Sequence, residues 1–138
     1  VLAPDIDYDK AHLQPVDILR ALPDTEINVV MGSSMGGLNA YAIAELIGRP
    51  ALLFNPPLSK YQPLQGSYEP KYPPIDSFKQ LLLGGSDEVV DPRDTLAFLS
   101  QHLQESELFL HIDPLLGHRI PMDLFEEQVT SFFSKLCY

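Results

Sequence analysis

Cysteine is almost absent from this chain of 138 residues, because Cys137, next to the last residue, is its only cysteine. A single cysteine cannot form an internal disulfide, and it has no partner at the spacing of a metal site. We therefore expect no structural disulfide, no metal centre and no role for Cys137. This cysteine usage fits the reducing cytoplasm, where we expect the protein to reside.

Basic residues are scarce as well. Nine Lys and Arg stand against 19 Asp and Glu, which gives a formal net charge of −10. The basic residues are scattered, so simple electrostatics opposes binding to nucleic acid or to an anionic membrane surface. No apolar run approaches the roughly 20 residues that span a bilayer, and no basic-then-apolar leader opens the chain. We expect neither nucleic acid nor a membrane as a partner.

What the chain does contain is typical of a folded globular protein, with 45% hydrophobic and 20% charged residues. Its length suits one domain, residues 1–138, that buries a core without cross-links. The apolar spacing predicts the elements of this domain. We expect the end of a strand at 1–3, strands at 27–32, 51–54, 78–83 and 108–112, and helices at 15–22, 35–47, 92–103 and 122–136.

Strands and helices therefore alternate along the chain, which predicts a mostly parallel sheet with helices on both faces, a three-layer α/β/α fold. Residues 55–77 interrupt the alternation with six of the 13 prolines and interleaved tyrosines. A long irregular segment in a compact domain is usually functional or mobile. We interpret it as a lid-like insertion; the alternative, a solvated linker, is disfavoured by its tyrosines and leucines.

Active sites in such sheets lie at the carboxyl ends of the strands, and a glycine-rich turn follows the predicted strand 27–32. Its Gly-x-Ser-x-Gly pattern, between a strand and a helix, is typical of a nucleophile elbow with Ser34 at its tip. Gly32 and Gly36 would remove collisions on so sharp a turn. The N–H of Met35, at the helix start, would donate to an oxyanion. The full turn reads Gly-Ser-Ser-Met-Gly-Gly.

A nucleophilic serine needs a base, which is usually a histidine after a later strand. His118 is best placed, since it follows the last predicted strand and precedes the terminal helix. His12 precedes the first helix and His102 is expected on a later helix, both at the surface. His111 falls inside a strand, where a packed or edge histidine is expected. The sequence therefore selects His118 as the base.

The base in turn needs an orienting carboxylate. Three acids follow the strand before last, and Asp87 is closest to its end. Asp91 precedes Pro92 and is expected to cap the next helix, which makes it the reserve. Glu88 is expected to be solvated. The resulting serine–acid–histidine order along the chain is the order of α/β-hydrolases.

These motifs together resemble the α/β-hydrolase superfamily, and within it the chain is similar to small bacterial YqiA-like esterases. The residues that carry the resemblance are the elbow, Asn-Pro-Pro at 55–57, Gly-Ser-Asp-Glu-Val-Val at 85–90 and Gly117-His118. The resemblance implies hydrolysis of a small-molecule carboxylic ester or thioester through an acyl-serine, with no cofactor. By position it makes Ser34 the nucleophile, Asp87 the orienting acid and His118 the acid/base.

The start of the chain departs from the family pattern. Members begin with a strand and a His-Gly loop that supplies a second oxyanion donor, whereas residues 1–4 resemble the following family strand. We therefore expect a core that lacks its first strand and oxyanion loop, with an exposed sheet edge. Loss of one oxyanion donor costs about 10²–10³ in turnover.

Two alternatives to an esterase remain open. The chain could be a catalytically impaired binding or scaffolding domain of the same fold. It could also be a flavodoxin-like nucleotide-binding domain in which residues 32–37 cradle a phosphate. The net charge of −10 and the lack of a phosphate-binding lysine in this turn argue against the nucleotide. The oligomeric state is open.

Overall fold

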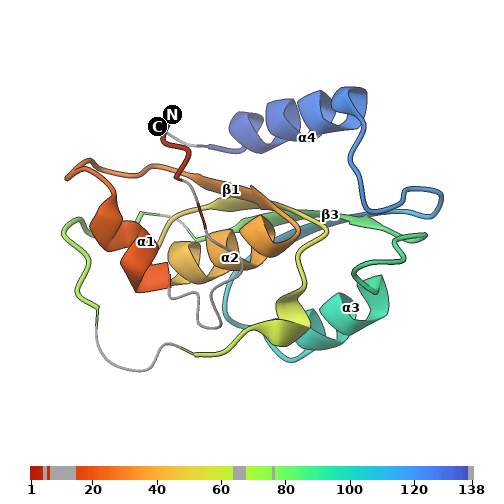
Figure 1. Cartoon of the computed structure of the whole chain (residues 1–138), viewed down its shortest axis with the longest axis horizontal. Helices are drawn as coiled ribbons and strands as arrows, with labels where there is room; N and C mark the ends of the chain where they lie inside the picture. The colour runs from red at the N-terminus through yellow and green to blue at the C-terminus, as the bar shows by residue number, and fades with distance from the viewer. Residues whose placement is uncertain (5, 7–14, 64–67, 76, 137–138) are drawn as a thin grey trace.

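A sheet of parallel strands forms the centre of the protein (Figure 1). The structure is a computed structural model, and it describes residues 1–4, 6, 15–63, 68–75 and 77–136. The described elements are, in chain order, α1 (Pro15–Ala21), β1 (Val30–Ser33), α2 (Met35–Ile47), β2 (Ala51–Phe54), the 3₁₀ turn η1 (Leu58–Lys60), β3 (Lys79–Gly84), α3 (Pro92–Ser100), β4 (Leu108–Asp113) and α4 (Met122–Ser134). From residue 15 onward the predicted alternation of helices and strands is confirmed.

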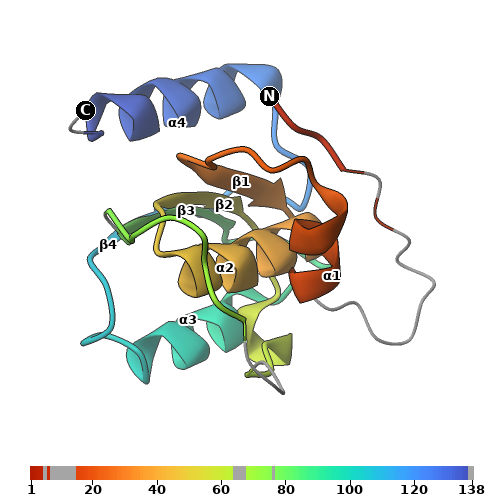
Figure 2. The ribbon, with the colours of Figure 1, turned by 90° about the vertical axis from the view of Figure 1, so that its left-hand side faces the viewer.

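The strands of the described residues lie in the order β1-β2-β3-β4, and each neighbouring pair is parallel. Helix α4 covers one face of this sheet, while α2 and α3 cover the other (Figure 2). Helix α1 packs beside α2. The predicted three-layer α/β/α fold is therefore confirmed.

The two central strands, β2 and β3, are buried along their whole length. This burial on both faces explains why their sequences are mostly continuous apolar runs. Successive side chains point to opposite faces of a sheet. Leu53 and Leu81 consequently pack into the cluster under α2 and α3, whereas Leu52 and Leu82 pack with Phe132 of α4. Full burial of one such side chain stabilises the fold by about 1.5–3 kcal/mol.

Strand β3 also begins with two polar residues that are buried. Lys79 pairs with Glu45 of α2 and donates to Ser106 Oγ at 3.2 Å. Gln80 donates from Nε2 to Oε1 of Gln128, on α4, at 2.9 Å. An unpaired buried polar group costs about 1–3 kcal/mol, so these partners make the two residues compatible with a central strand. They also tie β3 to the helices on both faces.

The bounds of β1, α3 and α4 differ from the predicted ones by a few residues. Strand β1 starts at Val30, later than predicted, because its ladder begins where the Val30 N–H donates to the Pro50 carbonyl at 3.0 Å. The carbonyl of Ile27 accepts instead from Arg49 Nε at 2.7 Å. Helices α3 and α4 end earlier than predicted, since i→i−3 hydrogen bonds tighten and close their last turns.

The strand end predicted at residues 1–3 is wrong. No strand is assigned there, and Val1 and Leu2 are exposed. The run is short and Pro4, which follows it, has no N–H to donate to a ladder. Without burial of its side chains, too little free energy is available to offset the entropy of ordering such a short segment.

The segment 55–77 is irregular in its described part apart from η1, and several contacts anchor it. The Tyr61 ring packs edge-on against Tyr41 of α2, with 5.1 Å between centroids. The Pro73 carbonyl accepts from Arg49 at 2.7 Å, and the Ile75 N–H donates to the Gly48 carbonyl at 3.2 Å. Its role as a lid stays a prediction.

Two residues discussed above, His12 and Cys137, lie outside the described residues. Within the part of the chain that the structure describes, no helix is long and apolar enough to cross a membrane.

Candidate active site

The turn between β1 and α2 holds Ser34 in a backbone conformation that side-chain-bearing residues rarely adopt, with φ 56° and ψ −127°. Such a conformation costs on the order of 1–3 kcal/mol and persists only when its surroundings enforce it. Here the Ser34 N–H donates to the Phe54 carbonyl at 2.9 Å. The Ser34 carbonyl accepts from the N–H groups of Gly37 and Leu38 at 2.9 and 3.1 Å. The sharp turn expected of a nucleophile elbow is therefore present.

Glycine is required at Gly32 by a close approach of the backbone. A Cβ on Gly32 would lie 2.1 Å from the carbonyl oxygen of Gly36, across the turn. A Cβ on Gly37 would lie 3.0 Å from Cβ of Pro56, in the segment after β2. The steric need predicted for Gly32 is thus confirmed, whereas the need predicted for Gly36 stays a prediction.

Ser34 is also the N-cap of α2, yet its side chain makes no capping hydrogen bond. Serine at an N-cap ordinarily accepts a hydrogen bond from a backbone N–H of the first turn. The Ser34 hydroxyl therefore does not cap the helix. Met35 is the first residue of α2, and the N–H at that position has no intrahelical acceptor. The Met35 N–H and the Ser34 hydroxyl therefore both lie at the start of α2.

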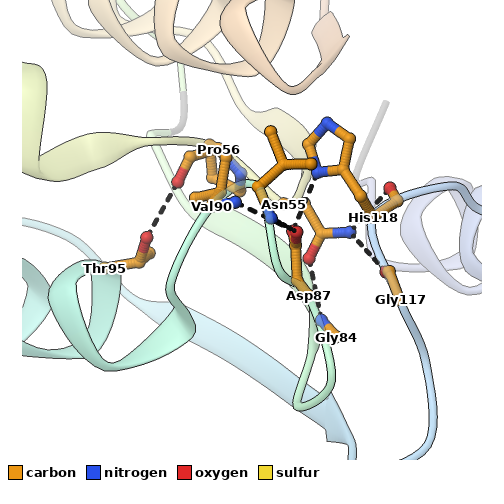
Figure 3. A network of polar contacts seen from close by, with 9 residues as sticks. Asn55, Pro56, Gly84, Asp87, Val90, Thr95, Gly117 and His118 are labelled. Atoms are coloured by element: carbon orange, nitrogen blue, oxygen red, sulfur yellow. Dashed lines mark hydrogen bonds and ion pairs between the residues drawn. The ribbon is translucent and has the colours of Figure 1, made fainter.

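His118 and Asp87 form a hydrogen-bonded pair at the ends of β4 and β3 (Figure 3). His118 Nδ1 and Asp87 Oδ2 are 2.9 Å apart; the carboxylate side chain is fully buried, while the His118 side chain is 25% exposed. The second carboxylate oxygen accepts from the N–H groups of Val89 and Val90 at 2.8 and 3.0 Å. The carboxylate is therefore fixed, and it holds the imidazole in one tautomer with Nε2 available to accept a proton.

The neighbouring acids lie as the sequence predicts. Asp91 is the N-cap of α3, accepts from the Arg93 N–H and pairs with the Arg93 guanidinium at 2.8 Å. The hydrogen bond from the Arg93 side chain lowers the pKa of Asp91. Glu88 is exposed. Of the three acids, Asp87 is the one that contacts His118.

The other described histidines occupy peripheral positions. His111 lies on β4, an edge strand of the described sheet, as predicted, and it is exposed. His102 follows the end of α3 instead of lying on a helix; it stacks on Phe98 and pairs with Glu105 at 2.9 Å. A helix position was predicted for His102, but α3 closes at Ser100.

Asn55 is a residue of this site that the sequence did not single out for a role. It lies directly after β2, and its side chain bridges the ends of β3 and β4 (Figure 3). Its φ of 45° is in the left-handed region, which asparagine tolerates better than most residues. An asparagine directly after a buried strand was the available signal, although its partners, Gly84, Gly117 and His118, lie far along the chain.

A cavity of about 430 Å³ adjoins His118. Its lining combines polar residues with an apolar wall, and consists of Ser33, Phe54, His118, Arg119, Ile120 and Phe125. Phe54 belongs to the cavity lining and also contacts the elbow, because its carbonyl accepts a hydrogen bond from the Ser34 N–H. The structure records no hydrogen bond between the Ser34 hydroxyl and His118 among its described residues. Such nucleophile–base bonds are often long without substrate and shorten when substrate binds.

The described residues hold no cluster of three or more His, Cys, Asp and Glu side chains that could bind a metal ion.

The fold is shared with known hydrolases. The chain is similar to the crystal structure of esterase PE8, with a TM-score of 0.52 and 18% identity over 79% of this chain and 50% of that one. It is also similar to acyl-protein thioesterase 2 of Zea mays, with a TM-score of 0.54 and 16% identity over 87% of this chain and 61% of that one. The chain thus spans 50% and 61% of the length of these two proteins.

A comparison with family models gives a match over residues 5–77 to the uncharacterised protein family UPF0227. No curated protein matches the chain. The matched part contains Ser34 and Asn55, whereas Asp87 and His118 lie beyond it. The chain belongs to the UPF0227 family and has an α/β-hydrolase fold.

Proposed function

We propose that this chain is a serine hydrolase that cleaves a carboxylic ester or thioester through an acyl-serine intermediate. The observation that carries the proposal is the pairing of buried Asp87 with His118 at the edge of the parallel sheet where the strained Ser34 turn also lies. A serine hydroxyl is a weak nucleophile until a base removes its proton. The pair supplies such a base, and the turn presents a hydroxyl that is not used for capping.

In the first half of the reaction, Ser34 Oγ attacks the carbonyl carbon of the substrate while Nε2 of His118 takes the hydroxyl proton. The carbonyl oxygen becomes an oxyanion, to which the Met35 N–H at the start of α2 donates a hydrogen bond. Asp87 holds the imidazole in place and stabilises the imidazolium. The intermediate collapses, the bond to the alcohol or thiol breaks, and His118 protonates the leaving group.

In the second half, water attacks the acyl-serine and His118 takes a proton from that water. A second oxyanion forms at the same position. Its collapse releases the carboxylic acid, and the proton on His118 returns to Ser34 Oγ. Every step of this cycle is a nucleophilic attack, a bond cleavage or a proton transfer to or from His118. The proposed cycle therefore involves no cofactor.

The cavity beside His118 supports a proposal for the substrate class. Phe54, Ile120 and Phe125 give it an apolar wall, and its volume is about 430 Å³. Apolar walls of this kind bind the hydrocarbon part of a ligand. We propose an ester or thioester of a small or medium acyl group as the substrate, with neither nucleic acid nor a membrane as partner and the cytoplasm as compartment.

Hydrolysis of p-nitrophenyl esters from acetate to decanoate tests this proposal. We expect kcat/KM to peak at a short or medium acyl chain and to fall for the longest ones. Asp87→Asn should lower kcat by roughly 10⁴-fold, because an amide stabilises the wrong tautomer of the base.

Two matched variants serve as controls. Asp91→Asn changes an acid of the same loop, and His111→Gln changes a histidine of the same sheet, but neither residue contacts the Asp87–His118 pair. Both should retain the activity of the unmodified chain. Equal losses in Asp87→Asn and Asp91→Asn, or no hydrolysis of any ester by the folded chain, would contradict the proposal.

A further inference from the structure

Asn55 uses every polar atom of its side chain. It is 2% exposed, and its Oδ1 accepts from the Gly84 N–H, at the end of β3, at 2.8 Å. Its Nδ2 donates to the carbonyl oxygens of Gly117 and His118, after β4, at 3.1 and 3.0 Å. One buried carboxamide therefore joins the ends of three strands, and one of its partners is the backbone of His118 itself.

The backbone of Asn55 is shaped for this bridge. Its N–H donates to the Leu82 carbonyl at 3.0 Å and so continues the pairing of β2 with β3. Its φ is then 45°, where the chain leaves the extended conformation. Asparagine is one of the few residues that visits this region at modest cost. A strained residue whose side chain meets three backbone groups indicates a conformation that the surrounding structure selects.

The loop after β4 is held in two parts. Residues 85–86 make three hydrogen bonds, between 2.7 and 3.0 Å, to the carbonyl groups of residues 113–116. Asn55 holds the following two carbonyls, at Gly117 and His118. The first part fixes where the loop leaves the sheet, whereas the second fixes the peptide unit that carries the imidazole.

The end of β3 leaves little freedom for this loop to shift. A Cβ on Gly84 would lie 2.4 and 2.5 Å from the carbonyl oxygens of Leu116 and Gly117. The loop therefore rests directly on the backbone of Gly84, and the Gly84 N–H is bound by Asn55. The carboxamide fixes the position of the loop and of the surface on which it rests.

We infer that Asn55 is a positioning residue for catalysis, which acts by fixing the backbone of His118 so that its imidazole meets both Asp87 and the Ser34 hydroxyl. The inference rests on the proposed function. Asp87 fixes the rotation of the ring through Nδ1, while Asn55 fixes the peptide to which the ring is attached. A shift of about 1 Å in such a group can lower the rate about 100-fold.

Asn55→Asp is the sharpest variant, because it keeps the size and the acceptor for Gly84 but replaces the two N–H donors by an oxygen that faces two carbonyls. Asn55→Ala, which leaves room without repulsion, is the second variant. The matched control is Thr95→Val. Thr95 is also buried and donates to the carbonyl of the adjacent Pro56 at 2.9 Å, without contacting the His118 loop.

Ester hydrolysis by each variant separates positioning from a purely structural role. We expect Asn55→Asp and Asn55→Ala to lower kcat by roughly 10- to 100-fold with KM within about twofold. Thr95→Val should keep kcat near that of the unmodified chain, even if its thermal midpoint falls as far as the midpoints of the two Asn55 variants. An unchanged kcat in a folded Asn55 variant, or an equal loss of kcat in Thr95→Val, would overturn the inference.

The downfield proton resonance of His118 Nδ1–H gives a second readout that does not depend on turnover. It should be present in the unmodified chain and in Thr95→Val, and it should broaden or vanish in Asn55→Asp and Asn55→Ala. A sharp, unshifted resonance in both Asn55 variants would overturn the inference even if the unmodified chain hydrolysed no ester. Absence of hydrolysis alone would instead count against the proposed function.

Discussion

At Ser34 the backbone conformation conflicts with the residue that occupies it. A positive φ combined with a ψ of −127° is a region that essentially only glycine adopts freely. The turn nevertheless carries a serine, held by the hydrogen bonds to Phe54, Gly37 and Leu38. Strain of this kind at a candidate nucleophile indicates that stability is lost locally in exchange for the placement of a hydroxyl.

Replacement of Ser34 therefore has a predictable effect on stability. Both Ser34→Ala and Ser34→Gly remove the hydroxyl, but only glycine relieves the positive φ. We expect the free energy of unfolding of Ser34→Gly to exceed that of Ser34→Ala by about 1 kcal/mol, since relief of 1–3 kcal/mol of strain outweighs the 0.5–1 kcal/mol entropic cost of glycine. Urea denaturation of the two variants measures the difference. A more stable alanine variant would contradict the strained turn.

The individual residues of the site were predictable to different degrees. Ser34, Asp87 and His118 could be selected because each follows a predicted strand, and strand ends meet at one edge of a parallel sheet. The hydrogen bond between His118 and Asp87 is consistent with that selection. The role of Asn55 was not predictable, because its partners lie 29 to 63 residues away and depend on the packing of two loops.

Among the elements, α2 shows how burial changes the chemistry of a side chain. Tyr41 packs with Tyr61 and Phe98 beneath the sheet, and Lys79 lies over its ring. Burial raises the pKa of Tyr41 above its ordinary value of 10.0, and the nearby Glu45 adds to the shift. The folded protein therefore keeps the neutral phenol at a pH where the unfolded chain has ionised.

This shift predicts a loss of stability at high pH. The folded pKa is raised, so the contribution of Tyr41 is complete below about pH 10 and decreases as the pH rises above that value. We expect the free energy of unfolding to fall more steeply between about pH 9 and 11 in the unmodified chain than in Tyr41→Phe. Denaturant titrations across that range provide the test, and parallel curves would show that Tyr41 is not responsible.

The elements themselves were predicted best where the local pattern and the packing agree. Strand β2 has its predicted bounds because all four of its residues are buried and apolar. The strand end at residues 1–3 failed because a short apolar run says nothing about whether a partner strand pairs with it. The start of β1 depends on Arg49, whose side chain donates a hydrogen bond to the Ile27 carbonyl. A local sequence pattern does not predict such a contact between residues 22 positions apart.

At the scale of the whole molecule, the site depends on all four strands of the described sheet. Ser34 follows β1, Asn55 follows β2, Asp87 follows β3 and His118 follows β4. These residues span much of the chain, yet the parallel register brings the four strand ends to one edge. Packing that fixes the strands therefore also fixes the geometry of the site.

The three-layer architecture makes a prediction for the two faces of β2. Leu52 faces α4 and Leu53 faces α2 and α3, and both are fully buried. We expect Leu52→Ala and Leu53→Ala each to lower the free energy of unfolding by about 2–5 kcal/mol. Leu110→Ala, at a side chain 42% exposed on β4, should cost about 1 kcal/mol or less. A small effect at Leu52 or Leu53 in urea denaturation would show that one face is not packed.

The central claim is that Ser34 is the nucleophile, and covalent labelling with a fluorophosphonate probe tests it most directly. Mass spectrometry should place the phosphonyl group on Ser34 of the unmodified chain. Ser33→Ala, at the exposed neighbouring serine, should still be labelled at Ser34, whereas folded Ser34→Ala should take up no label. No labelling of the folded, unmodified chain, or labelling that survives in Ser34→Ala, would contradict the account.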